Sequence, residues 1–190
     1  MVPIVVVGLG NPGSEYETTR HNIGFQVADA LSLRWKKPFK PGKGDYVVAR
    51  GEIGGRPVVL AKPLTYMNNS GLAVQDVLER YDATPGALLV IVDDVALPLG
   101  VLRFRARGTD GGHNGLASVM YQLQSDEFFR LRCGIMQEAM PPKTVLADFV
   151  LSRFDPEEID PVRAMIVRAA DAVTEFVVSG AASAMNKYNT

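Results

Sequence analysis

The order of apolar runs along the chain constrains its fold more than any other feature. Residues 4–7 form a β-branched run ended by glycines, which predicts a buried strand. Residues 22–35 place apolar side chains on one broad helical face. Strand and helix patterns alternate along most of the remainder. Strands are predicted over 46–53, 58–61, 88–92, 101–106 and 131–136. Helices are predicted from the cap Ser70 to about residue 81, over 116–123, and from 156 or 161 to 178. This order predicts one α/β domain over residues 1–190, with a mixed, mostly parallel twisted sheet and helices on both faces.

Length and composition exclude several classes of protein. The 190 residues suit one domain, and 47% apolar against 22% charged residues excludes intrinsic disorder. No apolar run reaches the roughly 18 residues that a membrane helix needs, and no basic stretch followed by an apolar one opens the chain. We therefore expect a cytoplasmic protein without membrane attachment. The single cysteine, Cys133, excludes an internal disulfide framework, and two histidines leave little room for a histidine-rich metal site.

A glycine pattern after the first predicted strand has to be weighed as a dinucleotide site. Residues 8–13 fit G-x-G-x-x-G. That fingerprint needs a helix that opens on the glycines and an acid about 20 residues further on, at the end of the next strand. Here the helical pattern begins about nine residues past Gly13, and Asp29 falls on a helix. The spacing argues against a nucleotide-dependent enzyme, and thermal-shift screening with NAD and ATP is the direct test of that rival.

Polar side chains gather in three glycine-rich stretches, at 10–22, 66–71 and 111–115, and in the pair Asp93-Asp94 after a predicted strand. Ligands of α/β sheets bind outside the carboxyl ends of strands, where these stretches are expected. Glycine lets a backbone approach a ligand, an asparagine amide offers a donor and an acceptor, and an imidazole titrates near neutral pH. Adjacent aspartates in a strand point to opposite sides, so only one of the two can reach a histidine. The combination predicts general-base chemistry.

Four ordered motifs give the chain a resemblance to a known family. They are V-G-L-G-N-P-G-x-x-Y-x-x-T-R-H-N-x-G-F at 7–25, P-x-x-Y-M-N-x-S-G at 63–71, D-D-x-x-L-P-x-G at 93–100 and G-G-H-N-G at 111–115. In order and spacing the chain resembles bacterial-type peptidyl-tRNA hydrolase. The resemblance implies hydrolysis of the ester between a peptide and the 3′ ribose of tRNA, which frees the tRNA for reuse. It also implies a monomer with no metal, no cofactor and no obligatory protein partner. Residues 134–143 depart from the family pattern, so their contacts to tRNA stay open.

The resemblance assigns site residues by position. His21 matches the family's catalytic histidine, and Asp93 matches the aspartate that supports it. The substrate-binding positions carried over in the same way are Asn11, Tyr16, Tyr66, Met67, Asn68, His113 and Asn114. Taken singly, Asn11 also suits a turn, Asn68 a helix cap and His113 a bond to a loop carbonyl, so each has a structural alternative.

Ester chemistry agrees with these assignments. An ester has a good leaving group, so an activated water suffices and no serine or cysteine nucleophile is required. We hypothesise that His21, held by Asp93, takes a proton from water, and that Asn11 or Asn68 stabilises the oxyanion. The rival is a non-catalytic RNA-binding relative of the same fold, which has no need of a tuned base. A turnover assay on an N-blocked aminoacyl-tRNA separates the two.

Basic residues are unevenly spread in a chain whose net charge is −1. The acid-free run 34–43 holds five lysines and arginines, which we interpret as solvated surface charge. Arginines alternate within 103–107 and again within 130–132, so each set shares one face of a strand. The resemblance assigns Arg105 and Arg132 to the tRNA 5′-phosphate, with the acceptor stem and the CCA end as the bound part of the substrate. A guanidinium suits phosphate because it donates two parallel hydrogen bonds.

Overall fold

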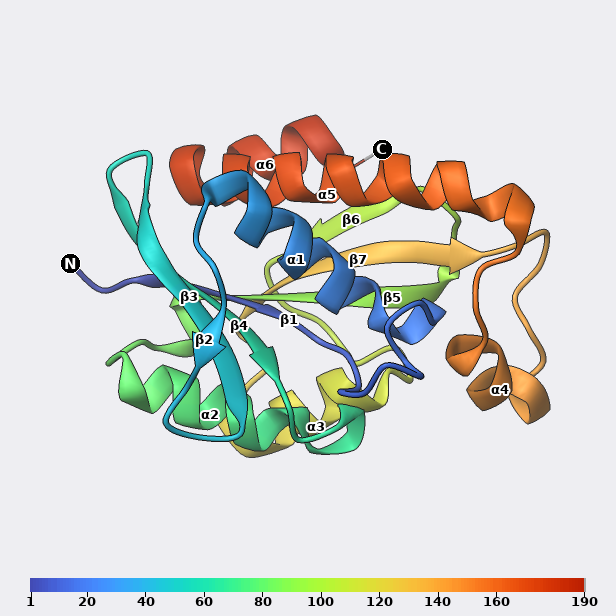
Figure 1. Cartoon of the computed structure of the whole chain (residues 1–190), viewed down its shortest axis with the longest axis horizontal. Coiled ribbons are helices and arrows are strands. Elements are labelled where there is room, and N and C mark those ends of the chain that lie inside the picture. The colour runs from blue at the N-terminus through green and yellow to red at the C-terminus, as the bar shows by residue number, and fades with distance from the viewer. Residues whose placement is uncertain (190) are drawn as a thin grey trace.

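A seven-stranded sheet forms the middle layer of the protein, and helices pack on both faces (Figure 1). The computed structural model describes residues 1–189. The strands are β1 (Ile4–Gly8), β2 (Lys40–Pro41), β3 (Tyr46–Ile53), β4 (Arg56–Pro63), β5 (Leu88–Pro98), β6 (Leu102–Arg105) and β7 (Phe129–Met136). The helices are α1 (Ile23–Trp35), α2 (Ser70–Arg80), α3 (Asn114–Leu123), α4 (Leu146–Leu151), α5 (Ile159–Ser179) and α6 (Ala181–Tyr188). Short 3₁₀ turns at Arg20–Asn22 and Met67–Asn69 lead into α1 and α2.

The sheet has the strand order β2-β3-β4-β1-β5-β7-β6. Strands β4, β1, β5 and β7 are parallel neighbours, whereas β3 and β6 pair with them in the antiparallel sense and β2 is antiparallel to β3. Most strands therefore run in one direction, which confirms the predicted mixed, mostly parallel sheet. The chain leaves β1 toward β4 on one side and leaves β5 toward β7 on the other. The carboxyl ends of β1 and β5 are thus the topological switch point, the usual place for a ligand.

Two apolar cores flank the sheet because alternate residues of each strand face opposite sides. Val6 belongs to the core under α1, α5 and α6, whereas Val5 and Val7 belong to the core under α2 and α3. All three valines are fully buried, and each contributes about 1.5–3 kcal/mol to folding. Figure 1 shows the same two helical layers, with α4 set apart at one end of the sheet. The prediction of helices on both faces is confirmed.

The glycines at and just after the end of β1 allow close packing and do not form a nucleotide turn. A Cβ on Gly8 would lie 2.1 Å from the carbonyl oxygen of Gly24, and one on Gly10 would lie 2.6 Å from the ring of Phe25. These glycines therefore let α1 press against the end of β1. Because α1 begins only at Ile23, its N-terminus does not meet the glycine turn. The structure supports the argument against a dinucleotide site.

Several details differ from the sequence-based expectations. Strand β5 runs on to Pro98, so the pair Asp93-Asp94 lies inside the strand and not after its end. Ser70 is the first residue of α2 and not its cap, since its hydroxyl donates to the carbonyl of Met67. The elements α4, α6 and β2 were not predicted, because each is too short to show a period. Within residues 1–189, every helix is too short or too polar to cross a membrane.

Candidate active site

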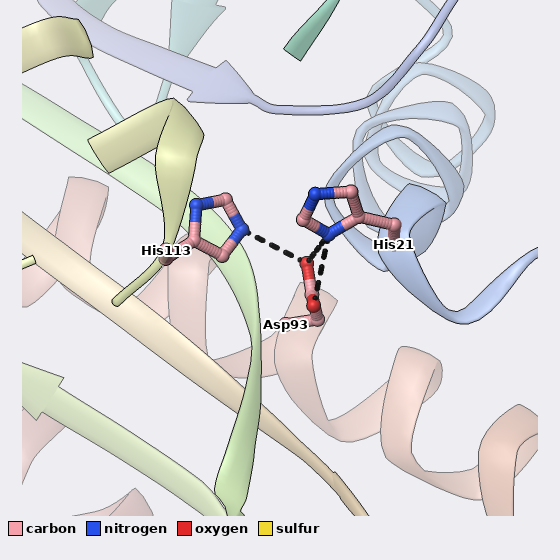
Figure 2. A group of neighbouring side chains, drawn as sticks. All are labelled: His21, Asp93 and His113. Atoms are coloured by element: carbon pink, nitrogen blue, oxygen red, sulfur yellow. Dashed lines mark hydrogen bonds and ion pairs between the residues drawn. The ribbon is translucent and has the colours of Figure 1, made fainter. Parts of the chain in front are cut away.

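Three titratable side chains meet at the switch point (Figure 2). His21 lies in the 3₁₀ turn between β1 and α1, Asp93 lies in β5, and His113 directly precedes α3. All three are buried, and the two imidazole centroids lie 4.8 Å apart. Figure 2 shows a ring nitrogen of each histidine directed at the carboxylate of Asp93. Three distant parts of the sequence therefore build one acid–base group.

The imidazole of His21 is held by Asp93 through Nδ1. This atom lies 2.8 Å from Oδ1 and 3.0 Å from Oδ2 of the carboxylate, which fits an N–H donor. In the neutral ring Nε2 then carries the lone pair, and it has no hydrogen-bond partner within residues 1–189. Burial alone would lower the pKa of His21, but the charge and hydrogen bond of Asp93 outweigh burial and raise the pKa above its ordinary value of 6.5. His21 is thus an oriented base with increased proton affinity.

His113 binds the same carboxylate in a fixed tautomer. Its Nδ1 accepts the backbone N–H of Leu116 at 3.2 Å and so caps α3. The ring proton therefore sits on Nε2, which donates to Oδ1 of Asp93 at 3.0 Å. The alternative of a bond to a loop carbonyl is wrong. Burial would raise the pKa of Asp93, but the charges and hydrogen bonds of both histidines outweigh burial and hold the pKa well below its ordinary value.

His21 opens onto a cavity of about 360 Å³. Asp94, Asn114 and Arg132 add polar groups to its wall. The loop before α4 and α4 itself complete the wall through Met140, Lys143, Leu146, Ala147 and Val150. A basic nitrogen, hydrogen-bonding side chains and an apolar surface therefore face one space. A small polar group such as an ester fits this arrangement.

Asn11 braces two loops of the site. Its Oδ1 accepts the backbone N–H of Met67 at 2.8 Å. Its own backbone N–H donates to Oδ1 of Asn22 at 2.9 Å, and its carbonyl accepts from Nδ2 of Asn22 at 2.9 Å. The side chain thus bonds outside its own loop, which a simple turn role does not explain. Asn22 was missed as a site residue, although it follows His21 in the motif.

Met67 and Tyr66 have different environments in the next loop. Met67 is buried, and a Cβ on Gly115 would lie 2.5 Å from its sulfur, so only glycine at 115 lets the first turn of α3 pack against Met67. Tyr66 is 55% exposed and has φ +62° with ψ 161°, a conformation that is nearly confined to glycine. Such a conformation costs about 1–3 kcal/mol and is typical of functional sites. It accompanies the bond from Met67 to Asn11.

A second cavity of about 460 Å³ adjoins the first at Asn114, which lines both. Asn68 lines the second cavity together with the exposed ring of Tyr121. Asn68 does not occupy the cap position of α2, so the cap alternative is wrong. Tyr16 lines neither cavity. Of the seven predicted substrate-binding positions, Asn68, His113 and Asn114 therefore line the two adjoining cavities, whereas Asn11, Tyr66 and Met67, like Tyr16, line neither.

Arg132 and Arg105 lie on neighbouring strands in different settings. Arg132 lines the first cavity, pairs with Asp94 at 3.4 Å and donates to the carbonyl of Thr109 at 2.7 Å. Arg105 is exposed and does not line that cavity; its guanidinium donates to a backbone carbonyl of its own strand.

Asp94, the second aspartate of the pair, has partners of its own. Besides its pairing with Arg132, its Oδ1 accepts the backbone N–H of Ala96 at 2.8 Å. The prediction that only one of the two aspartates reaches His21, and that this one is Asp93, agrees with this geometry.

Arg130 shares a strand face with Arg132 but is fully buried. Its guanidinium donates to the carbonyls of Gly108, Asp126 and Phe128. Burial and the neighbouring cation of Arg132 lower its pKa to about 10. Arg130 therefore fixes the start of the glycine loop and is not free to bind phosphate.

Arg20 supports the cavity and was not predicted as a functional residue. Its guanidinium bonds twice with Glu158, at 2.9 and 2.6 Å. The rings of Phe149 and Phe154 lie 4.6 and 4.8 Å from its central carbon. These partners belong to α4 and the segment after it, so Arg20 ties the turn that carries His21 to the wall of the cavity. Its only sequence signal was its place beside that histidine, and Glu158 gave none.

The His21, Asp93 and His113 trio also offers three ligand atoms within 4.8 Å of one another. A metal ion would need both nitrogens that face the carboxylate to be deprotonated. The nitrogens instead lie at N–H···O distances from Asp93, and the Leu116 bond keeps the proton of His113 on the side of the carboxylate. The trio therefore fits an acid–base centre better than a metal centre.

Comparison with known proteins gives one consistent result. The family model for peptidyl-tRNA hydrolase matches residues 5–190. The peptidyl-tRNA hydrolase of Chlorobaculum parvum is 43% identical over 97% of this chain and 97% of its own length, and that of Chloroflexus aurantiacus is 48% identical over 97% and 98%. The crystal structure of peptidyl-tRNA hydrolase from Acinetobacter baumannii superposes with a TM-score of 0.92 at 35% identity, covering 99% of this chain and 95% of that one. Similarity in sequence and in fold extends over the whole length.

Proposed function

The chain belongs to the peptidyl-tRNA hydrolase family and hydrolyses peptidyl-tRNA, and from this premise we propose that His21 is the base that activates the attacking water. The observation that carries the proposal is the state of its two nitrogens. Nδ1 donates to Asp93, so the free lone pair of the neutral ring is on Nε2, and the ring lines the cavity. A water between Nε2 and the ester carbon has its acceptor already in place.

The reaction follows from this arrangement. Nε2 takes a proton from water as the water oxygen attacks the ester carbonyl, which forms a tetrahedral intermediate. The bond from the carbonyl carbon to the 3′ oxygen then breaks, and the proton on Nε2 passes to the leaving 3′ oxygen. The products are a peptide acid and a tRNA with a free 3′ hydroxyl. Asp93 is a positioning residue, because it holds the ring and stabilises the imidazolium while the proton resides there.

The geometry favours Asn11 over Asn68 as the donor to the oxyanion. The Oδ1 of Asn11 accepts the N–H of Met67, which fixes the orientation of the amide and leaves Nδ2 as the donor for a ligand. A donor that is held before the charge develops stabilises a transition state most effectively. Asn68 is exposed in the second cavity, where it suits the bound substrate together with Asn114. Tyr66 and Tyr16 line neither cavity, so their roles stay predictions.

Arg132 and Arg105 are the proposed contacts for the 5′-phosphate of the acceptor stem. Arg132 is engaged with Asp94 at the long distance of 3.4 Å, so a phosphate competes with a weak partner. We also propose that the protein acts as a monomer in the cytoplasm, since one chain supplies the whole trio. Sedimentation of the protein alone and with tRNA tests the monomer. The proposed reaction uses no metal ion or cofactor, so EDTA should leave the rate unchanged.

The direct test is a single-turnover assay of His21→Ala on an N-blocked aminoacyl-tRNA. General-base catalysis contributes about 10²–10⁴ in rate, so we expect a loss of that size with little change in KM. Asp94→Asn is the matched control: it removes a neighbouring carboxylate that does not touch His21, and it should change KM more than the rate. A loss below about tenfold for His21→Ala would contradict the proposed role.

A further inference from the structure

We propose that a basic pocket at the edge of the sheet remote from Arg105 and Arg132 binds the phosphate backbone of the RNA. The inference rests on the function above only in taking tRNA as the substrate. A cavity of about 560 Å³ lies between the β2–β3 segment, the residues after α1 and the end of α2. Its lining includes the cations Lys37, Lys40, Lys43, Arg50 and Arg80, and no carboxylate.

The five cations of this pocket lack acidic partners among the described residues, and the guanidinium of Arg50 lies 6.0 Å from the ring centroid of Tyr81 in the pocket wall. Within residues 1–189, no salt bridge or side-chain hydrogen bond engages any of them. Many other cations on the surface do have partners, as in Arg34–Asp171, Lys62–Asp29 and Lys187–Glu175. Asp76 lies against the backbone of Gly44 nearby but does not line the pocket. In a protein of net charge −1, this local excess of positive charge attracts an anion.

Two of the cations have a simpler structural explanation, which does not extend to the others. Lys37 follows α1 and Arg80 ends α2, and cations at helix C-termini compensate the helix dipole. Lys40, Lys43 and Arg50 lie on or beside β2 and β3, where no helix ends. The stem of Lys37 also lies across Gly51 of β3, toward the others. The sequence-based interpretation treated the cations of 34–43 as solvated surface charge. The fold brings Arg50 and Arg80 beside the cations of that run, which the sequence pattern did not indicate.

The form of the pocket favours a phosphodiester chain over a small phosphate ligand. Small phosphates are usually held by backbone N–H groups at a helix N-terminus. Here both adjoining helices present their C-termini, whose dipoles repel anions, so binding depends on separate long side chains. Lysine and arginine side chains of this kind contact nucleic-acid backbones without reading sequence.

The position of the pocket selects a long ligand. Helix α1 has 13 residues and separates His21 from Lys37, which corresponds to about 20 Å along its axis. Strand β3, beside the pocket, lies four places in the sheet from β7, which carries Arg132. At roughly 4.8 Å per strand, the two strands are about 19 Å apart. A substrate bound at the catalytic cavity therefore reaches the pocket only through its RNA body. The pocket would add affinity without touching the ester.

The test compares two double variants with equal loss of charge. Lys40→Gln/Arg50→Gln removes two exposed cations of the pocket, and Arg56→Gln/Lys187→Gln removes two exposed cations that line neither catalytic cavity nor this pocket. With full-length peptidyl-tRNA, we expect the pocket variant to raise KM about two- to thirtyfold, since exposed charge pairs contribute about 0.2–1 kcal/mol each. We expect kcat to stay unchanged. The slope of log kcat/KM against log salt concentration, which is negative, should become shallower by about 1–2 units.

A short substrate separates this effect from damage to the catalytic site. The N-acetyl-aminoacyl ester of adenosine is too short to span about 20 Å, so the pocket variant and the control variant should hydrolyse it equally. Equal behaviour of the two variants on full-length substrate would overturn the proposal. An equal loss on the adenosine ester would also overturn it, because the effect would then act through the fold. A failure of the His21 proposal would instead appear in the His21→Ala rate, with no change in these comparisons.

Discussion

Replacing Asp93 by asparagine tests how the two histidines share one carboxylate. Oδ1 of Asp93 accepts from both Nδ1 of His21 and Nε2 of His113. An asparagine has a single oxygen, and the bond from Leu116 fixes His113 as a donor, so the amide oxygen stays with His113. The amide NH₂ then faces Nδ1 of His21. It stabilises the tautomer with the proton on Nε2, which removes the lone pair from the cavity.

The expected loss follows from the contacts that change. A hydrogen bond to a charged group contributes about 1.5–3 kcal/mol, and the variant removes the carboxylate charge from two of them. The imidazolium formed during the reaction also loses its counter-ion. In serine proteases, the same aspartate-to-asparagine change beside the catalytic histidine lowers kcat about 10⁴-fold, because the histidine then adopts the wrong tautomer. We expect Asp93→Asn to lower the single-turnover rate about 10³–10⁴-fold.

A second substitution makes the explanation refutable. In Asp93→Asn/His113→Ala, the amide is free to turn its oxygen toward His21, so the double variant should react faster than the two single losses multiplied together predict. Nitrogen NMR of the His21 ring should show the proton on Nδ1 in the wild type and on Nε2 in Asp93→Asn. Strictly multiplicative losses, or a wild-type tautomer in the slow variant, would refute the reasoning.

Three further predictions concern pH, stability and packing. In a pH–rate profile, kcat/KM of the wild type should rise with a midpoint above pH 6.5, because the base must be neutral and the pKa of His21 is raised. In Asp93→Asn only the effect of burial on His21 remains, and burial lowers the pKa. The same rise should therefore occur at lower pH. Glu158→Gln removes the bidentate partner of the buried Arg20 guanidinium and leaves only the exposed carboxylate of Asp155, 3.7 Å away. Urea denaturation at pH 7 should show a loss of about 3 kcal/mol, the lower end of the cost of breaking a buried ion pair. The pKa of Glu158 is lowered in the folded protein, so its contribution is present above its ordinary value of 4.5 and the difference should shrink as the pH falls below it. Gly115→Ala places a Cβ 2.5 Å from the buried sulfur of Met67, so the variant should lose about 1–3 kcal/mol of folding stability and react more slowly. Gly86→Ala is the control, because its Cβ has no neighbour closer than 3.8 Å, and thermal unfolding should show almost no change.

The layered fold was predictable because its signals are local. A β-branched run such as residues 4–7 has few other uses than a buried strand, and the alternation with helical faces determines the class. The choice between Asp93 and Asp94 was also local in part, since neighbours in a strand face opposite sides. Only the family resemblance chose between them. The individual roles of the asparagines needed the structure, because an amide in a loop has several ordinary uses.

The features that sequence patterns missed depend on long-range contacts or short elements. Arg20 and Glu158 are 138 positions apart, and neither residue type in its own context indicates a buried pair. Helix α4 spans six residues, fewer than two turns, so its apolar side chains show no period. The basic pocket combines residues from 37 to 81 that only the sheet brings together. These features arise from tertiary packing, which the local propensity of a sequence segment does not predict.

The sharing of Asp93 also decides where the proton travels. Nδ1 of His113 accepts the N–H of Leu116 and Nε2 donates to Asp93, so both of its ring nitrogens are engaged. His21 is therefore the imidazole of the trio whose second nitrogen has no partner within the described residues. In the proposed mechanism, the proton taken from water consequently stays on Nε2 of His21, next to the bound substrate. The proposal then gives it one acceptor, the 3′ oxygen of the leaving tRNA, so the group that activates the water would also release the product.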